Sequence, residues 1–483
     1  MSSPTVTVSA KPPRTPSRPG PALGVAVLCT AGVAMSLTQT LIMPLITMLP
    51  RVFGTSAASA SWAVTVTMAV GAVATPIAGR LGDMVGRRSL LLVCVGAVGA
   101  GSLVCAVAPS LPVFLAGRAL QGLGVAFVAV GISIMREFVP AARLGTAVGM
   151  MSSSLAVGGA LGLPLSALVA QTYGWRVLFW VAAAGSLVCL MGIRALIPSG
   201  GTRTGGRFDL FGAVGLGAIL LTLLLPLSNG PVWGWSSPIT LSLFAASVLI
   251  SVGWLVYEKR RPSPLLDLRV AVLRPVFLGN TIGVLNSFAF YGMELIPIQM
   301  LMAPAAAPHG LAVSMLTAGL LMAPTGVAAF VSSNVGARIV TAHGPRRTLL
   351  IAGVLAITAL SALLFALVVG WEFPLGYLVG ITCLIGISTG MSYATLPTLI
   401  MAAVPLEQTG EANGLNALMR IVGLAAAAAV VGMLLADGAV DVPGTSQTAP
   451  SASGYLLATT AGLVAAVASL LAALFLPRVQ RPR

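Results

Sequence analysis

The sequence predicts an all-α polytopic membrane protein, and three observations lead to this fold class. Of the 483 residues, 57% are hydrophobic and only 8% are charged, whereas a soluble domain has roughly 45–50% apolar and about 25% charged residues. The chain contains fourteen apolar runs of about 20 residues, the length of a helix that crosses a bilayer. No stretch alternates apolar and polar side chains at period two, as the strands of a membrane β-barrel do over about ten residues.

Fourteen transmembrane helices are therefore expected, and the apolar runs set their approximate bounds. Several runs contain Gly or Pro, which transmembrane helices tolerate because neighbouring helices satisfy the freed backbone groups. The predicted spans are 22–46, 58–78, 89–109, 112–134, 145–169, 175–196, 210–228, 237–257, 276–302, 311–335, 347–369, 374–402, 412–436 and 454–476.

The distribution of Arg and Lys predicts the orientation of these helices. Basic residues occur in both tails and in alternate loops, and an excess of this kind marks the cytoplasmic side. One loop, with Glu407 and Glu411, breaks the series. Both termini are therefore expected in the cytoplasm, which also requires an even number of spans. The net charge is +15, but the basic residues are spread over short loops rather than gathered on one face. We therefore expect no nucleic-acid partner.

Residues 1–21 are rich in Pro and Ser, and we expect a disordered cytoplasmic tail there. The first apolar run follows this tail and is as long as a span, which argues against a cleaved signal peptide. The five cysteines lie within apolar runs and show no CxxC spacing. The sequence therefore predicts no disulfide, no metal site and no cofactor.

The segments 79–91 and 337–350 are similar to each other. GRLGDMVGRRSLL and ARIVTAHGPRRTLL share an early Arg, a Gly before a basic pair, and a following apolar run. Such internal similarity is typical of transporters built from two related halves. The predicted organisation is a cytoplasmic tail (1–21), a six-helix bundle (22–196), two inserted spans (210–257), a second six-helix bundle (276–476) and a second cytoplasmic tail (477–483).

The loop of residues 79–88 concentrates charge in an otherwise apolar chain, and we call it the clasp. Gly82 and Gly86 would let the backbone turn tightly, and Asp83 could cap a helix N-terminus. Such a clasp could hold the two halves together in one state and release them in another. The alternative is a plain turn whose charges only set the topology. The residues assigned to the clasp are Gly79, Asp83, Gly86, Arg87 and Arg88.

Three segments resemble motifs of the major facilitator superfamily. The clasp is similar to the signature G-x-L-x-D-x-x-G-R-R between spans two and three, and FLAGRALQGLGVAF resembles the fourth-span motif R-x-x-Q-G-x-G, with Arg118 as its arginine. GGALGLPLSAL resembles the fifth-span motif of antiporters, G-x-x-x-G-P, at Gly158, Gly162 and Pro164, although Leu163 stands between the second glycine and the proline.

Further segments resemble the fourteen-span drug:proton antiporters within this superfamily. They are RFDLFGAVGLGAILL at the seventh span, WGW at 233–235 and EKRRPSPLLDL after the eighth span. The resemblance implies two six-helix bundles of the major facilitator fold with two inserted spans. It also implies export of a small molecule, a drug or a secondary metabolite, driven by protons that flow inward.

Glu294 is the candidate proton carrier. Neither lysine belongs to the phosphate-binding motif G-x-x-x-x-G-K-[ST], so this chain alone cannot use ATP by that route. Of eleven acidic residues, only Glu294 lies well inside a span, where removal from water favours the protonated carboxyl. The alternative is a hydrated or paired carboxylate at the outer mouth. The resemblance also implies a role in proton coupling for Arg118, for which the alternative is a buried guanidinium bonded to backbone carbonyls.

Polar residues within the spans are candidates for an adaptable substrate cavity. They are Gln39, Asn286, Tyr291, Gln299 and Arg420. The alternatives are hydrogen bonds between helices and, for Arg420, a side chain that snorkels to the interface. Thr38 stands where the fourteen-span family often carries an aspartate. We therefore expect a neutral, zwitterionic or anionic substrate.

The sequence as a whole predicts a proton-coupled exporter of a drug or antibiotic in the plasma membrane. The alternative is a proton-coupled importer of a small organic solute with the same fold. A membrane-embedded enzyme is not expected, because the spans contain no grouping of His with a carboxylate or Ser. The bias towards Arg, Ala and Gly suggests a GC-rich bacterial genome, in which such an exporter would give self-resistance.

Overall fold

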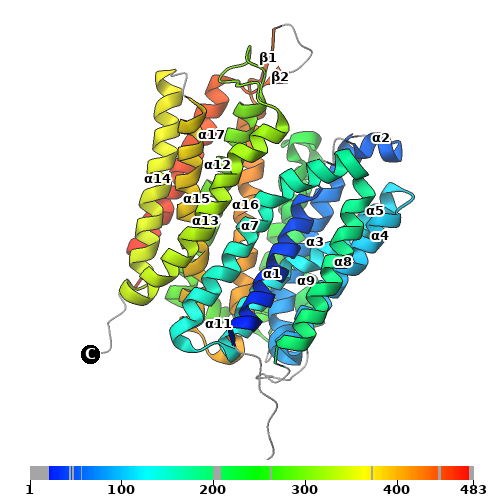
Figure 1. Ribbon diagram of the computed structural model, residues 1–483. Helices are drawn as coiled ribbons and strands as arrows, with labels where there is room; N and C mark the ends of the chain where they lie inside the picture. The colour runs from blue at the N-terminus through cyan, green and yellow to red at the C-terminus, as the bar shows by residue number, and fades with distance from the viewer. Residues whose placement is uncertain are drawn as a thin grey trace, which may run out of the picture.

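The computed structural model describes residues 21–42, 45, 48–55, 57–198, 208–261, 264–370, 374–443 and 448–477. Its long helices run side by side from one end of the molecule to the other (Figure 1). This is the all-α architecture that the sequence predicts. The expected tails lie outside the described residues, apart from Pro21 and Pro477.

The first half of the chain forms one group of helices, drawn in blue to green in Figure 1. Its largest apolar core joins buried side chains of the first, fourth, sixth and seventh helices, among them Leu28, Leu91, Met135 and Met151. The elements are α1 (Pro21–Thr40), α2 (Leu49–Phe53), α3 (Ala57–Val85), α4 (Arg87–Val107), α5 (Leu111–Gly122), η1 (Leu123–Ala126), α6 (Phe127–Phe138), α7 (Ala141–Tyr173) and α8 (Trp175–Leu196).

The second half forms a matching group, drawn in lime to red. Its largest core includes Ile296, Leu360, Leu363 and Tyr455. The elements are α11 (Leu268–Ala271), α12 (Arg274–Met302), α13 (Met315–His343), α14 (Pro345–Val369), α15 (Leu375–Ala403), η2 (Leu406–Gln408), α16 (Thr409–Ala436), β1 (Val440–Asp441), β2 (Thr448–Ala449) and α17 (Ala452–Leu474).

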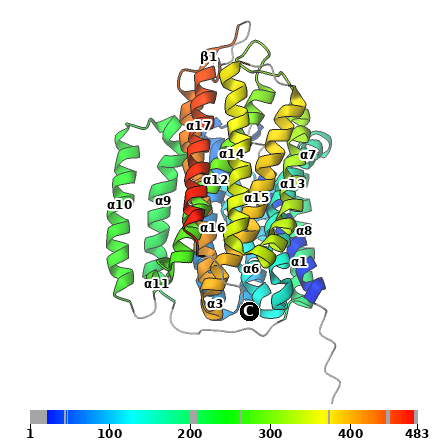
Figure 2. The ribbon, with the colours of Figure 1, turned by 90° about the vertical axis from the view of Figure 1, so that its left-hand side faces the viewer.

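The two inserted helices, α9 (Leu210–Trp233) and α10 (Pro238–Lys259), stand beside the two groups (Figure 2). Helix α9 packs against α3 and α16, and α10 packs against α9. Because α10 has few protein neighbours, its apolar side chains remain exposed, as Leu249 is at 73%. Such a face is what a helix in contact with lipid presents.

The fourth predicted span is not one continuous α-helix. It consists of α5, the 3₁₀ segment η1 and α6. Gly122 and Gly124 lie at this change, where added Cβ atoms would come within 2.7 Å of the Thr67 carbonyl oxygen and 2.3 Å of Val98. The break therefore coincides with a close approach of neighbouring helices, and 3₁₀ irregularity within a helix often marks a hinge.

Thirteen helices within the described residues are long and apolar enough to cross a membrane. The fifth predicted span is not among them, although α7 extends over 33 residues. The count of fourteen therefore stays a prediction. The first span is shorter than expected, since α1 ends at Thr40 and is followed by turns, and the strand pair β1–β2 was not predicted at all.

Both ends of the described chain lie towards one end of the molecule, and β1 lies at the other (Figure 2). The turn between α3 and α4 lies at the end where α1 begins, because α1 and α3 run in opposite directions (Figure 1). We call these the clasp end and the hairpin end.

We predict that the clasp end is cytoplasmic. A full-length variant with Val440→Cys, exposed in β1, should react with a membrane-impermeant maleimide in intact cells. The matched variant Arg269→Cys, exposed in α11, should react only after permeabilisation. The parent chain measures labelling of the native cysteines. The opposite pattern would reverse the orientation that the Arg and Lys distribution predicts.

Candidate functional site

The turn of the clasp depends on one glycine conformation. Gly86 has φ 107° and separates α3 from α4, and Gly344 has φ 85° at the matching point of the second half. Residues with a Cβ rarely adopt these angles, so both positions favour glycine. Gly82, which the sequence analysis placed in the turn, lies inside α3, because that helix continues to Val85.

Asp83 caps a helix of the other half. Its carboxylate accepts hydrogen bonds from the backbone N–H groups of Gly410, at 3.2 Å, and Glu411, at 3.0 Å. These two amides belong to the first turn of α16, where backbone N–H groups have no partner within the helix and a negative charge is stabilising. The side chain is 1% exposed. Asp83 thus links the two halves through a charge and a helix terminus.

Arg87 completes this contact from α4. Its Nε and Nη2 donate to Asp83 Oδ1 at 3.0 and 2.6 Å, and Nη1 forms an ion pair with Glu137 at 2.5 Å. Nη2 also donates to the carbonyl oxygen of Leu406, at 2.8 Å. A guanidinium can make several charge-assisted bonds in one plane. Arg87 therefore ties α4 to α6 and to the segment that leads into α16.

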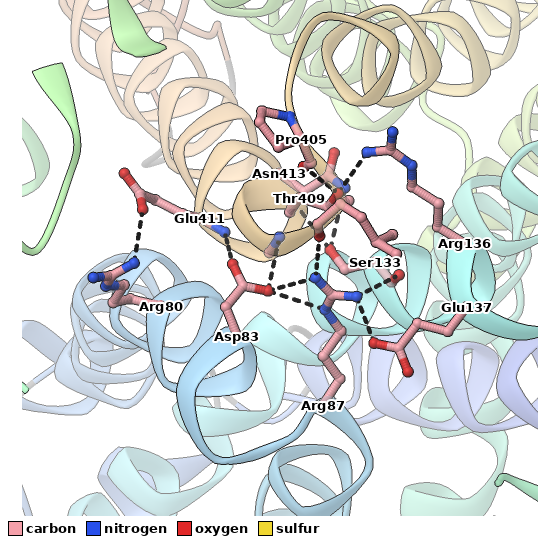
Figure 3. Close-up of polar contacts among 12 residues, drawn as sticks. Arg80, Asp83, Arg87, Ser133, Arg136, Glu137, Pro405, Thr409, Glu411 and Asn413 are labelled. Carbon is pink, nitrogen blue, oxygen red and sulfur yellow. Dashed lines mark hydrogen bonds and ion pairs between the residues drawn. The ribbon is translucent and has the colours of Figure 1, made fainter. Parts of the chain in front are cut away.

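Further polar contacts surround this centre (Figure 3). Arg80 forms an ion pair with Glu411 at 3.4 Å, and Arg136 donates to Thr409 Oγ1 at 2.6 Å. Sequence reasoning did not assign Glu137, Arg136, Thr409 or Glu411. In the sequence, only Glu411 could have been suspected, because Glu407 and Glu411 interrupt the series of basic loops.

The two helix backbones nearly touch at the clasp. A Cβ atom added to Gly79 would lie 2.4 Å from the carbonyl oxygen of Gly410, and one added to Gly410 would lie 2.6 Å from that of Gly79. Real Cβ atoms do not come this close, so both positions require glycine while the halves are in contact. This approach brings Asp83 within reach of the amides of α16.

Within the described residues, Arg88 makes no hydrogen bond or ion pair to the second half. It donates to the carbonyl oxygen of Arg194 in α8, which belongs to its own half. Of the five predicted clasp residues, Gly79, Asp83 and Arg87 therefore contact the second half, Gly86 shapes the turn, and Arg88 binds within the first half.

The inserted helices are connected to the clasp through the segments RFDLFGAVGLGAILL and EKRRPSPLLDL. Asp209 caps α9 and accepts a hydrogen bond from the Tyr257 hydroxyl of α10 at 2.8 Å. The next residue, Glu258, is 2% exposed and accepts from the backbone N–H of Leu266 at 2.8 Å. The backbone N–H of Asp267 then donates to Glu411. Three polar contacts, linked to one another through neighbouring residues of the chain, thus lead from α9 to α16.

The fifth-span glycines form a packing surface for α1. An added Cβ would lie 2.4 Å from Ser36 Cβ at Gly158 and 1.7 Å from Thr40 Oγ1 at Gly162. Ser36 also donates to the Leu155 carbonyl oxygen, at 2.7 Å. Pro164 falls within α7, and its side chain lies outside the described part of the structure.

Arg118 is buried among neutral acceptors. Its Nε donates to the Ala63 carbonyl oxygen at 3.0 Å, and Nη1 donates to the Thr38 carbonyl at 3.2 Å and to Gln121 Oε1 at 2.6 Å. Within the described residues it forms no ion pair with a carboxylate. These bonds agree with the alternative interpretation of Arg118, a buried guanidinium bonded to backbone carbonyls. All of them lie in the first half of the chain, away from Glu294.

Glu294 lies on α12, and its side chain is exposed, whereas Met293, Ile296 and Pro297 are buried. It is eight residues before the helix ends at Met302, or about 12 Å along the axis. A carboxylate at this depth is stable only beside water or a partner. Glu294 therefore requires water, a proton or a polar partner to remain at this position.

The predicted cavity residues are spread over several environments. Asn286 Nδ2 donates to Ser392 Oγ at 3.0 Å and its Oδ1 accepts from Ser469 at 2.7 Å, so it joins α12 to α15 and α17. Among the described residues, the buried Oε1 of Gln299 has no hydrogen-bond partner, and Gln39 and Tyr291 are half-buried. Arg420 lies over the ring of Tyr393.

An apolar groove of about 800 Å³ opens between α13 and α15, and none of the predicted cavity residues lines it. Its polar lining is limited to Ser332. The lining residues are Leu320, Ala323, Pro324, Val327, Ala328, Val331, Ser332, Val335, Ile387 and Met391.

This chain belongs to the Major Facilitator Superfamily, whose profile matches residues 28–428. It is 28% identical over 377 residues to the tetracenomycin C resistance and export protein of Streptomyces glaucescens, a match that covers 77% of this chain and 68% of the relative. It is also 28% identical over 368 residues to the multidrug resistance protein Stp of Mycobacterium tuberculosis, covering 74% of this chain and 65% of that protein.

Solved structures with the same fold support this assignment. The human organic anion transporter MFSD10 (TETRAN) aligns with a TM-score of 0.65 at 16% identity, covering 94% of this chain and 100% of that one. The proton:xylose symporter XylE aligns with a TM-score of 0.64 at 15% identity, covering 95% and 96%. The protein is therefore a multi-pass transporter of the plasma membrane, as expected from its sequence.

We predict that Asp83→Asn weakens the contact between the halves at the clasp end. The change keeps the shape but leaves the buried Arg87 with a poorer partner, which costs about 1–3 kcal/mol. The readout is the yield of disulfide cross-linking between Gly145→Cys in α7 and Thr341→Cys in α13. A Cβ atom added to Gly145 would lie 3.6 Å from Thr341 Cγ2, which is van der Waals contact. The yield should fall several-fold.

Arg88→Gln in the same cysteine pair is the matched control, because Arg88 binds only within its own half. Its cross-linking yield should equal that of the parent pair. An unchanged yield in Asp83→Asn, or an equal fall in Arg88→Gln, would contradict the proposed role of the Asp83 contact.

Proposed function

We propose that this protein exports a drug or a secondary metabolite such as an antibiotic in exchange for protons. The observation that carries the proposal is the combination of a clasp that joins the halves at one end and an exposed carboxylate, Glu294, inside the helical part near the other end. A carrier needs both: a contact that opens and closes, and a group that binds the coupling ion.

The similarity to named exporters supports the direction of transport. Besides the tetracenomycin C and multidrug resistance proteins, the probable actinorhodin transporter of Streptomyces coelicolor is 27% identical over 383 residues. The match covers 75% of this chain and 63% of that relative, so the activity of this protein is inferred from a common part rather than from the whole length.

Glu294 is assigned to proton binding on physical grounds. An exposed carboxylate within a helix of the second half can exchange protons with water near the hairpin end, and rocking of the halves would close that access. In this scheme the clasp stabilises the state in which the clasp end is closed, and its release opens the cavity towards the cytoplasm. Glu294 would lose one proton to the cytoplasm when a substrate molecule binds there, and would take up one proton from outside when the substrate leaves.

Arg118 has a positioning role in this proposal. Its guanidinium fixes Thr38 in α1, Ala63 in α3 and Gln121 in α5 around one buried charge. Three helices of the first half are thereby held as a unit, which a rigid-body movement of that half requires. The next bond in this network runs from Gln121 to Ser102 in α4, at 2.8 Å.

We predict that Glu294→Gln abolishes substrate-evoked proton release. Inverted vesicles energised by respiration accumulate protons, and a pH dye reports their efflux when compounds are added. A panel of cationic, neutral and anionic aromatic compounds should contain at least one that evokes efflux with the wild-type chain and not with Glu294→Gln. The Glu294→Gln variant removes the charge of the carboxylate and keeps the shape of the side chain.

Asp441→Asn is the matched control, since Asp441 is an exposed carboxylate in β1 outside the long helices, and it should transport like the wild type. Efflux that survives in Glu294→Gln would place proton binding elsewhere. If no compound evokes efflux, while uptake of a solute into intact cells is driven by protons, the chain is an importer and the proposal is wrong.

A further inference from the structure

Within the described residues, Arg420 carries a charge without a hydrogen-bond or ion-pair partner in the middle of a membrane-spanning helix. It lies eleven residues after the start of α16 at Thr409, or about 16 Å along the axis, which is half the roughly 30 Å of the hydrocarbon layer. Its Nε is buried and has no hydrogen-bond partner, and within the described residues the guanidinium makes neither a hydrogen bond nor an ion pair. The side chain is therefore not snorkelling to the interface.

An arginine in this position is costly unless something accepts its hydrogen bonds. The guanidinium has five N–H donors in a planar fork and stays protonated in proteins. Arg118 shows how this chain satisfies such a group when the role is structural, because three neutral acceptors surround it. Arg420 has no such set among the described residues, so its N–H donors are left available to water or to a ligand.

The surroundings of Arg420 favour an aromatic ligand. Its guanidinium carbon lies 4.2 Å from the centre of the Tyr393 ring, and this ring meets Phe290 edge-on, with centroids 6.5 Å apart. All three side chains are half-buried. A guanidinium that stacks on an aromatic face keeps its donor edge free to bind a planar anion at two points.

No negative side chain competes for this position among the described residues. The stem of Arg420 lies 3.6 Å from the Cβ position of Gly283 in α12, and Glu294 is eleven residues further along that helix, or about 16 Å. One turn before Arg420, Asn416 donates to Asn280 at 3.2 Å, which is a neutral pair. Thr38 in the first helix is neutral as well.

We propose that Arg420, Tyr393 and Phe290 form the substrate subsite and that the substrate is an aromatic organic anion. Its carboxylate, sulfonate or phenolate group accepts hydrogen bonds from the Arg420 guanidinium, and its ring packs against Tyr393 and Phe290. This inference rests on the proposed export function and adds the chemical class of the substrate. An anion that leaves the cell also moves with the membrane potential, which is negative inside.

The test compares 1-naphthoate with its uncharged analogue 1-naphthamide on the full-length protein in phosphatidylcholine nanodiscs. A ligand that binds the folded state raises the midpoint of thermal unfolding as its concentration rises. We expect saturable stabilisation by 1-naphthoate and roughly tenfold weaker or no binding of 1-naphthamide. Arg420→Gln should weaken 1-naphthoate binding by about tenfold or more, and Arg420→Lys by less, because a charge remains.

Two further variants separate a binding effect from a folding effect. Arg338→Gln removes an exposed arginine of α13 and should bind 1-naphthoate like the wild type. Tyr393→Leu keeps Arg420 and removes the stacking platform, so the affinity should fall several-fold. Variants are compared by the shift relative to their own unliganded midpoint, which corrects for any loss of stability.

The subsite and the export function can fail separately. If 1-naphthoate binds in a manner that depends on Arg420 and no compound evokes proton efflux, the subsite stands and the proposed function fails. Equal binding of 1-naphthamide, unchanged binding by Arg420→Gln, or no binding of 1-naphthoate by the wild type would each overturn the inference.

Discussion

This arrangement of the two halves depends on the hydrogen bonds between the Asp83 carboxylate in α3 and the backbone N–H groups in the first turn of α16. One side chain satisfies two free backbone amides of a helix that follows it by more than 300 residues. Its geometry is possible only because Gly79 and Gly410 let the two helices approach to backbone contact. Arg87 supplies the opposite charge, so the acid is buried without being left unpaired.

The contact between the halves is unequal on its two sides, although the sequence repeat is symmetric. Thr341 occupies the position in the second half that corresponds to Asp83, and its hydroxyl bonds to the Arg338 carbonyl of its own helix. The facing surface on α7 consists of Gly145 and Gly149, packed against Thr341, Ala337 and the backbone of Ser333. One interface is therefore held by charge and the other by close packing of small residues.

Three ionisable groups inside the helical region have three different environments. Arg118 is satisfied by neutral acceptors of its own half, Glu294 is exposed near the hairpin end, and Arg420 faces aromatic rings without an acceptor among the described residues. The cost of a charge in a membrane explains why they differ. A satisfied group can be structural, whereas an unsatisfied one is retained only where water, a proton or a ligand completes it.

The sequence by itself determined the all-helical membrane fold, the repeat and the turn at Gly86, because apolar run length and glycine conformation are local properties of the chain. It also singled out Glu294, Arg118 and Arg420, since charges in apolar runs are rare. Only the tertiary structure decided their partners. In the sequence Glu411 resembles any acidic loop residue, whereas in the structure it binds Arg80 and the backbone N–H of Asp267. Arg87 and Arg88 are adjacent and chemically identical, but Arg87 bonds to the second half and Arg88 to the first. Partner choice depends on which distant helices pack together, and a periodic pattern of apolar residues carries no information about that.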